Sequence, residues 1–262
     1  MQEKITLEKI IKEVLEDHGE KDSVSYEANM RRVRRAFDIL IERLGSNKEA
    51  LKHGGKNIEF KESEKSFMKV IISQLYDNEG MVAEFVNERN RDKTFSSKDV
   101  RKLIQALIDE ADKTGMNEAE LIHLAQFFSN IFLISPLRSL EYCHTLIDCL
   151  ALNLQDLTYS EQAKYLQRVE WILKKEFAIR FVELTLNIEG LGMLIEERRK
   201  LVGDDIYSEN FYEYDEEIRY EYIQRDKEVI KRIQEDDDLR QYIEKKFGKR
   251  AEEIFNYAVL DM

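Results

Sequence analysis

Proline and glycine are scarce in this chain, and their scarcity limits the folds open to it more than any other feature of the sequence. One proline and ten glycines in 262 residues are too few for the many turns of a loop-rich β protein. Glutamate, lysine, leucine and isoleucine are frequent instead, and apolar residues recur at helical spacing nearly throughout. The sequence therefore predicts an all-α protein built from amphipathic helices.

The most distinctive of these helices is predicted over residues 29–45. Its apolar residues recur at three- and four-residue steps and so form one stripe: Met30, Val33, Phe37, Leu40, Ile41 and Leu44. Arg31, Arg32, Arg35 and Arg43 point away from that stripe, and Arg34 flanks it. In a chain with a formal net charge of −12, this arginine face is either a solvated surface or a surface that binds phosphates or an acidic partner.

The order of elements around this helix carries a resemblance. A helix is predicted at residues 5–15, before the arginine helix. After it come the turn signal His53-Gly54-Gly55, an alternating strand at residues 56–60 and a helix at residues 65–76. Two helices, a short β-wing and a further helix, over residues 3–77, resemble a winged-helix unit of the MerR-like kind.

The resemblance implies a DNA-binding role for particular residues. The arginine helix would face the groove of duplex DNA, with Lys52 and Lys56 on the wing near the phosphates. The polar stretch at residues 87–97 suggests where this helix-turn-helix-like unit ends. We expect a nucleic-acid-binding unit at residues 1–90 and a multi-helix bundle at residues 91–262.

The acidity of the chain is concentrated in residues 204–238, which hold fourteen Asp and Glu against five Lys and Arg, a net charge of −9. This segment is either a solvated helix face or a protein-binding surface that imitates the charge of nucleic acid. In the second case its tyrosines would anchor the interface: Tyr207, Tyr212, Tyr214, Tyr220 and Tyr222. Inhibitory proteins of mobile elements are often acidic and helical in the same way.

Candidate catalytic and metal-binding patterns are weak. Glu120 and His123, like Glu141 and His144, have the spacing with which two helical residues share a metal, but neither pair is centred on its helix's apolar stripe. Cys143 diverges from the neighbouring His144 by about 100° around a helix, so the two cannot form a thiol–imidazole pair. We therefore expect no enzyme activity, no metal and no cofactor.

Cysteine content and hydropathy bear on the compartment. Cys143 and Cys149 are the two cysteines of the chain, and their spacing does not suit a disulfide within one helix. The most apolar run, residues 121–135, is too short to span a bilayer, and the charged N-terminus does not resemble a signal peptide. These features predict a cytoplasmic protein with no membrane partner.

Two functions from different classes follow. The first is a nucleic-acid-binding regulatory protein that uses the arginine helix on duplex DNA, with a helical body that dimerises or receives a partner. The second is an acidic protein-interaction or inhibitor protein of a mobile element, which acts through residues 204–238 and binds no nucleic acid.

Overall fold

The computed structural model describes residues 4–21, 23–44, 50–52, 56–77, 97–113, 115–133, 136–187 and 216–260. Of these residues, 83% are helical, in ten helices with one two-stranded sheet, which confirms the all-α prediction. The chain divides into two compact units, Met1–Phe127 and Phe128–Met262. The boundary expected near residue 90 lies outside the described residues, and the helix at residues 97–112 belongs to the N-terminal unit.

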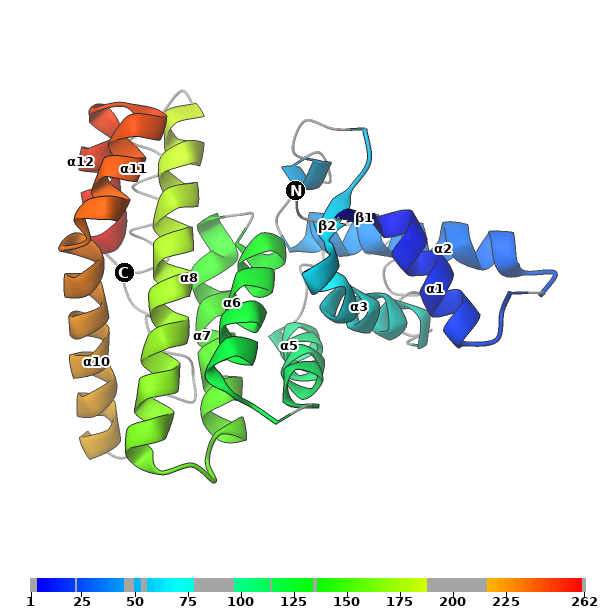
Figure 1. Cartoon of the computed structure of the whole chain (residues 1–262), viewed down its shortest axis with the longest axis horizontal. Helices are drawn as coiled ribbons and strands as arrows, with labels where there is room; N and C mark the ends of the chain where they lie inside the picture. Colours follow the sequence, from blue (N-terminus) through cyan, green and yellow to red (C-terminus); the bar gives the residue numbers. More distant parts are fainter. Residues whose placement is uncertain are drawn as a thin grey trace. The chain divides into compact units, whose positions relative to one another are not determined.

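Unit 1 is a small helical bundle with a sheet at one side (Figure 1). The helices α1, α2 and α3 pack against one another, and α5 packs on α3. The elements in chain order are β1 (Lys4–Thr6), α1 (Leu7–Asp17), α2 (Tyr26–Arg43), the 3₁₀ turn η1 (Ala50–Lys52), β2 (Glu59–Lys61), the 3₁₀ turn η2 (Glu62–Glu64), α3 (Lys65–Asp77) and α5 (Ser97–Asp112).

The sheet differs from the predicted wing. The strand expected at residues 56–60 is present at Glu59–Lys61, but its partner is the N-terminal strand β1, antiparallel and with Ile5 opposite Phe60. Residues 5 and 6 were expected to be helical; instead α1 begins at Leu7, and the Thr6 hydroxyl accepts a hydrogen bond from the Lys9 backbone N–H at 3.3 Å. The predicted turn at residues 53–55 lies outside the described residues.

Helix α2 confirms the predicted apolar stripe. Five of its six expected members are buried, and the sixth, Met30, is half-buried. The buried set, which includes one further residue, is Val33, Ala36, Phe37, Leu40, Ile41 and Leu44. The helix starts at Tyr26, directly after Ser25, one of the two serines that the sequence offers as its N-cap. This burial fixes which side of α2 can face solvent.

Unit 2 is organised around the long helix α8 (Tyr159–Asn187), against which α7 (Pro136–Asn153), α10 (Glu216–Gln234) and α12 (Arg250–Leu260) pack (Figure 1). The helix α6 (Glu118–Phe132) crosses the boundary between the units. Rings from α6, α7 and α8 fill much of the core: Phe128, Phe132, Tyr142, Phe177 and Phe181.

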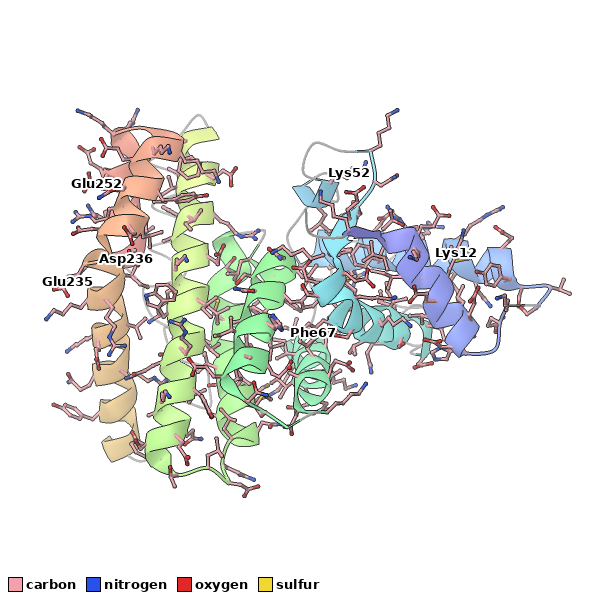
Figure 2. All side chains as sticks on the ribbon, viewed as in Figure 1. Lys12, Lys52, Phe67, Glu235, Asp236 and Glu252 are labelled. Atoms are coloured by element: carbon pink, nitrogen blue, oxygen red, sulfur yellow. The ribbon has the colours of Figure 1, made fainter. Side chains whose placement is uncertain are left out.

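The apolar spacing of residues 239–260 predicts one helix, but the structure has two there. These are α11 (Asp237–Phe247) and α12, separated at Gly248, whose φ of 90° lies in the left-handed region that favours glycine. The Asp236 carboxylate caps α11 by accepting a hydrogen bond from the Leu239 backbone N–H at 2.9 Å (Figure 2). In the part of the chain that the structure describes, no helix is long and apolar enough to cross a bilayer.

Candidate nucleic-acid interface

The connection between α1 and α2 is held by one carboxylate, that of Glu20. Its Oε2 accepts hydrogen bonds from the Ser23 hydroxyl at 2.5 Å and from the Asn29 amide at 3.1 Å, while Oε1 accepts one from the Tyr76 hydroxyl at 2.7 Å. The Ser23 and Tyr76 hydroxyls, in that order, lower the pKa of the Glu20 carboxyl. These contacts tie the start of α2 to the end of α3 and so set the direction in which α2 projects.

Tyr76 is also the centre of a ring cluster. The His18 ring lies 4.7 Å from the Tyr76 ring, and the Arg32 guanidinium carbon lies 5.5 Å from its centroid. His18 places Nδ1 2.8 Å from the Val14 carbonyl oxygen and Nε2 3.1 Å from the Asp77 carboxylate.

The four arginines expected at the interface, Arg31, Arg32, Arg34 and Arg35, do not share one environment. Arg31 and Arg35 are exposed, as expected. Arg32 differs from the expectation, since it is half-buried over the Tyr76 ring and its Nε is buried without a hydrogen bond. Arg34 is half-buried and forms an ion pair with Asp38 at 3.5 Å. The free part of the arginine face therefore consists of Arg31 and Arg35, one helical turn apart.

The two lysines expected on the wing also differ from each other. Lys52 lies on η1 and is half-buried (Figure 2), whereas Lys56 is exposed. The predicted wing tip, residues 53–55, falls outside the described residues, so the structure does not bring these two lysines together with the α2 arginines in a described site.

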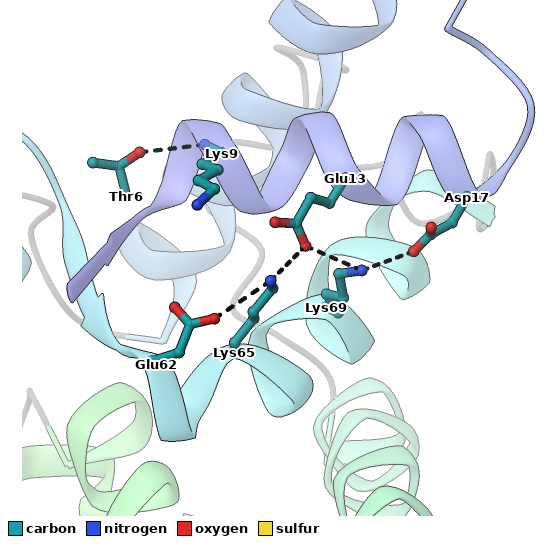
Figure 3. A network of polar contacts seen from close by, with 7 residues as sticks. All are labelled: Thr6, Lys9, Glu13, Asp17, Glu62, Lys65 and Lys69. Atoms are coloured by element: carbon teal, nitrogen blue, oxygen red, sulfur yellow. Dashed lines mark hydrogen bonds and ion pairs between the residues drawn. The ribbon is translucent and has the colours of Figure 1, made fainter. Parts of the chain in front are cut away.

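Two other basic residues of unit 1, Lys65 and Lys69, form ion pairs within the fold (Figure 3). Lys65 and Lys69 of α3 lie 2.9 and 3.2 Å from the same Glu13 oxygen on α1. Lys69 also pairs with Asp17 at 2.9 Å, and Lys65 with Glu62 at 3.4 Å. Burial alone would raise the pKa of the Glu13 carboxyl, but the two ammonium groups outweigh it and lower that pKa. These lysines join α1 to α3 and are not available to a ligand.

The acidic segment is described only from residue 216 onward. Tyr207, Tyr212 and Tyr214 lie outside the described residues, as does the side chain of Tyr222. Tyr220 lies on α10 and is 62% exposed. From Glu216 to Gln234 the segment is helical, as α10.

Helix α10 is docked by a buried ion pair. The Arg225 guanidinium donates to both oxygens of Glu170 on α8, at 3.0 and 2.7 Å. Val229 and Ile233 are buried beside it. One side of α10 is therefore packed on α8, while Tyr220, Glu228 and Glu235 remain exposed.

The candidate catalytic and metal-binding patterns lie on α6 and α7. No group of three or more His, Cys, Asp and Glu side chains gathers there as a metal site. His123 is exposed, and the side chain of Glu141 is outside the described residues. Burial raises the pKa of the Cys143 thiol to about 12, so the reactive thiolate is not formed near neutral pH.

Sequence reasoning missed Glu20 and Tyr76, the residues that position α2. They are 56 positions apart, and neither lies in a motif. The cluster Ser23, Ser25 and Asn29 was a signal for a helix start, but nothing in the local sequence indicates a tyrosine from α3 as the third support.

Comparison with known proteins adds no assignment. No protein-family model matches the chain, and searches of the curated proteins and of the solved structures give no significant match.

Proposed function

We propose that this protein is a regulatory protein that binds duplex nucleic acid through the exposed side of α2. One observation carries the proposal. In a chain with 53 acidic residues, Arg31 and Arg35 are exposed on the same side of one helix, and neither has an ion-pair or hydrogen-bond partner within the described residues. The α3 lysines, by contrast, are held by carboxylates.

The supports of α2 make this side well suited to phosphates. The apolar stripe holds one side of the helix in the core, and Glu20 fixes its first turn through Ser23 and Asn29. Arginines on a rigid helix lose less freedom on binding than arginines on a loop. We assign the phosphate contacts to Arg31 and Arg35, and assign Arg32 and Arg34 to holding the helix in place.

The test is salt-dependent binding of a duplex of mixed sequence, measured by fluorescence anisotropy. Replacing both arginines, Arg31→Ala with Arg35→Ala, should lower affinity by about tenfold to a hundredfold near 0.1 M salt, because two phosphate contacts are lost and the slope of log K against log salt falls by about 1.8. The matched control is Lys9→Ala with Lys12→Ala, which removes the same charge from exposed positions of α1 and should leave the slope nearly unchanged.

Two results would defeat the proposal: wild-type protein that binds no duplex at low salt, or an arginine variant that binds like wild type. Either result would favour the second candidate function, that of an acidic protein-interaction or inhibitor protein that acts through residues 204–238. The observation in its favour is Tyr220, a large aromatic side chain left exposed on α10. It requires a stoichiometric protein partner whose binding is lost in Tyr220→Ala while the helix content is kept.

A further inference from the structure

A second basic surface lies in unit 2, where α11 ends and α12 begins. Residues 240–250 hold five Lys and Arg and one Glu, directly after the acidic residues 204–238. Four of these cations fall within six positions, and all four are exposed: Lys245, Lys246, Lys249 and Arg250. Within the described residues, none of the four has a carboxylate as an ion-pair partner. We call these four residues the α11–α12 tip.

Gly248 brings the four cations together. Its left-handed backbone ends α11, and its own N–H donates to the Glu244 carbonyl at 2.8 Å while its carbonyl accepts from the Ala251 N–H at 3.0 Å. The chain therefore leaves one helix and enters the next within two residues, and the last turn of α11 and the first turn of α12 share one corner.

Helix electrostatics explain only half of this cluster. Lys245 and Lys246 lie in the last turn of α11, where the helix dipole favours cations. Lys249 and Arg250 lie at the start of α12, where the dipole disfavours them. The fifth basic residue, Arg240, is paired with Glu252 at 2.9 Å, so that carboxylate is occupied, and the nearby exposed Glu244 and Glu253 are too few to neutralise four cations.

Aromatic side chains accompany the charge. The Lys246 ammonium lies 5.5 Å from the centroid of the Tyr242 ring and 4.8 Å from that of Phe247. Tyr242 is 46% exposed. Cations that follow a phosphate backbone, beside a ring on which a base can stack, are the combination with which proteins hold nucleic acid without reading its sequence.

We infer that the α11–α12 tip is a second contact surface for the phosphodiester backbone of nucleic acid. The inference rests on the proposed function for the class of ligand, but it uses other residues in the other unit and is tested separately. Unit 2 would then contribute sequence-independent affinity, in addition to what α2 contributes.

The experiment uses the full-length chain in four forms: wild type, the α2 variant with Arg31→Ala and Arg35→Ala, a tip variant with Lys245→Gln, Lys249→Gln and Arg250→Gln, and the two sets combined. Lys246 is kept because it packs on two rings. The control is Lys227→Gln, Lys231→Gln and Arg232→Gln, which removes three exposed charges from α10 of the same unit. Circular dichroism melting confirms that each form folds.

The probes are a 40-base-pair duplex and a 40-nucleotide single strand, titrated at several salt concentrations. The tip variant should bind at least about tenfold more weakly near 0.1 M salt. For the duplex, the slope of log K against log salt should fall by about 2 to 3, because three cations are removed. The control variant should show neither change. A larger loss for the single strand than for the duplex would assign Tyr242 to base stacking, which Tyr242→Ala then checks.

The outcomes separate the two proposals. If the tip variant binds like wild type while the α2 variant weakens, the tip inference is wrong and the proposed function stands. If only the tip variant weakens, the tip inference holds and the α2 assignment fails. Tip-dependent binding of polyglutamate or of phosphatidylserine vesicles as strong as that of nucleic acid would overturn the choice of ligand.

Discussion

Both units join their helices through charged side chains, but at very different depths. In unit 2 the Glu170 and Arg225 side chains are 7% and 10% exposed and form one two-pronged contact. In unit 1 the Glu13, Lys65 and Lys69 side chains are 24%, 28% and 30% exposed. Water and salt reach the ion pairs of Glu13 in unit 1 and weaken them. The ion pair between Glu170 and Arg225 in unit 2 is buried, so the loss of one partner there is costly. Unit 2 should therefore respond strongly to mutation, and unit 1 to salt and pH.

The largest expected effect comes from breaking the buried pair. Arg225→Met should lower the free energy of unfolding of unit 2 by about 3 to 5 kcal/mol, because it removes the guanidinium that donates to both oxygens of the buried Glu170 carboxylate. Urea unfolding followed by tryptophan fluorescence measures this effect. Trp171, the single tryptophan, lies on α8 next to Glu170 and so reports on unit 2.

The double variant Glu170→Leu with Arg225→Leu is the control for that measurement. Removing both charges together should cost less than about 1 kcal/mol or stabilise the unit, because no unpaired charge remains. If the double variant loses as much as Arg225→Met, the pair contributes through shape and packing, and the contrast with unit 1 disappears.

The second expected effect is smaller and depends on salt. Glu13→Gln should cost unit 1 about 1 kcal/mol at low salt and clearly less at 0.5 M salt, because its ion pairs with Lys65 and Lys69 are partly exposed. Differential scanning calorimetry at the two salt concentrations measures it, and Trp171 fluorescence should stay unchanged. Glu16→Gln is the matched control, since within the described residues Glu16 forms one surface ion pair, with Lys21 at 3.6 Å. A salt-independent loss would contradict the assigned mechanism.

The same contrast shows what the sequence could predict. The helices follow from apolar periodicity, and the stripe of α2 is buried as predicted because helical spacing depends only on neighbours in the chain. The pairing of β1 with β2 joins residues more than fifty positions apart. The three residues of β1 are too few to show an alternating pattern. The break at Gly248 had a local signal, a glycine after lysines, which the continuing apolar spacing of residues 239–260 obscured.

The candidate site was predictable to a similar extent. Helical spacing placed Arg31 and Arg35 on the exposed side of α2. The same spacing could not distinguish Arg32 from them, because its environment is set by Tyr76, from α3. The packing of α10 on α8 could not be predicted for another reason. Arg225 lies in a strongly acidic segment, and its buried partner Glu170 is 55 positions away. Charge counts along a chain do not show which charges pair in the fold.

The smallest expected effect is the pH response of the contact between Glu20 and Tyr76. The pKa of Glu20 is lowered from 4.5, so its contribution to stability is complete above that value and is lost as pH falls through the lower pKa of the folded state. The pKa of Tyr76 is raised from 10.0, chiefly by its hydrogen bond to Glu20, so its contribution is complete below that value and is lost as pH rises through the higher folded pKa.

The hydrogen bond from Tyr76 to Glu20 should therefore weaken at both low and high pH. Two variants separate the titration of Glu20 from that of Tyr76. Ser23→Ala removes the hydrogen bond that lowers the pKa of Glu20 most. It should reduce the fall in melting temperature at acid pH and leave the fall at alkaline pH as in wild type. Tyr76→Phe should reduce both sides, because it removes the group that titrates at high pH and one of the donors to Glu20. Calorimetry from pH 3 to pH 11 at fixed ionic strength measures both changes in melting temperature. Each should be smaller than the change in melting temperature that Glu13→Gln causes at low salt. An alkaline change in Tyr76→Phe equal to that of wild type would show that the contact does not stabilise the start of α2, and the rigid presentation of Arg31 and Arg35 would then need another support.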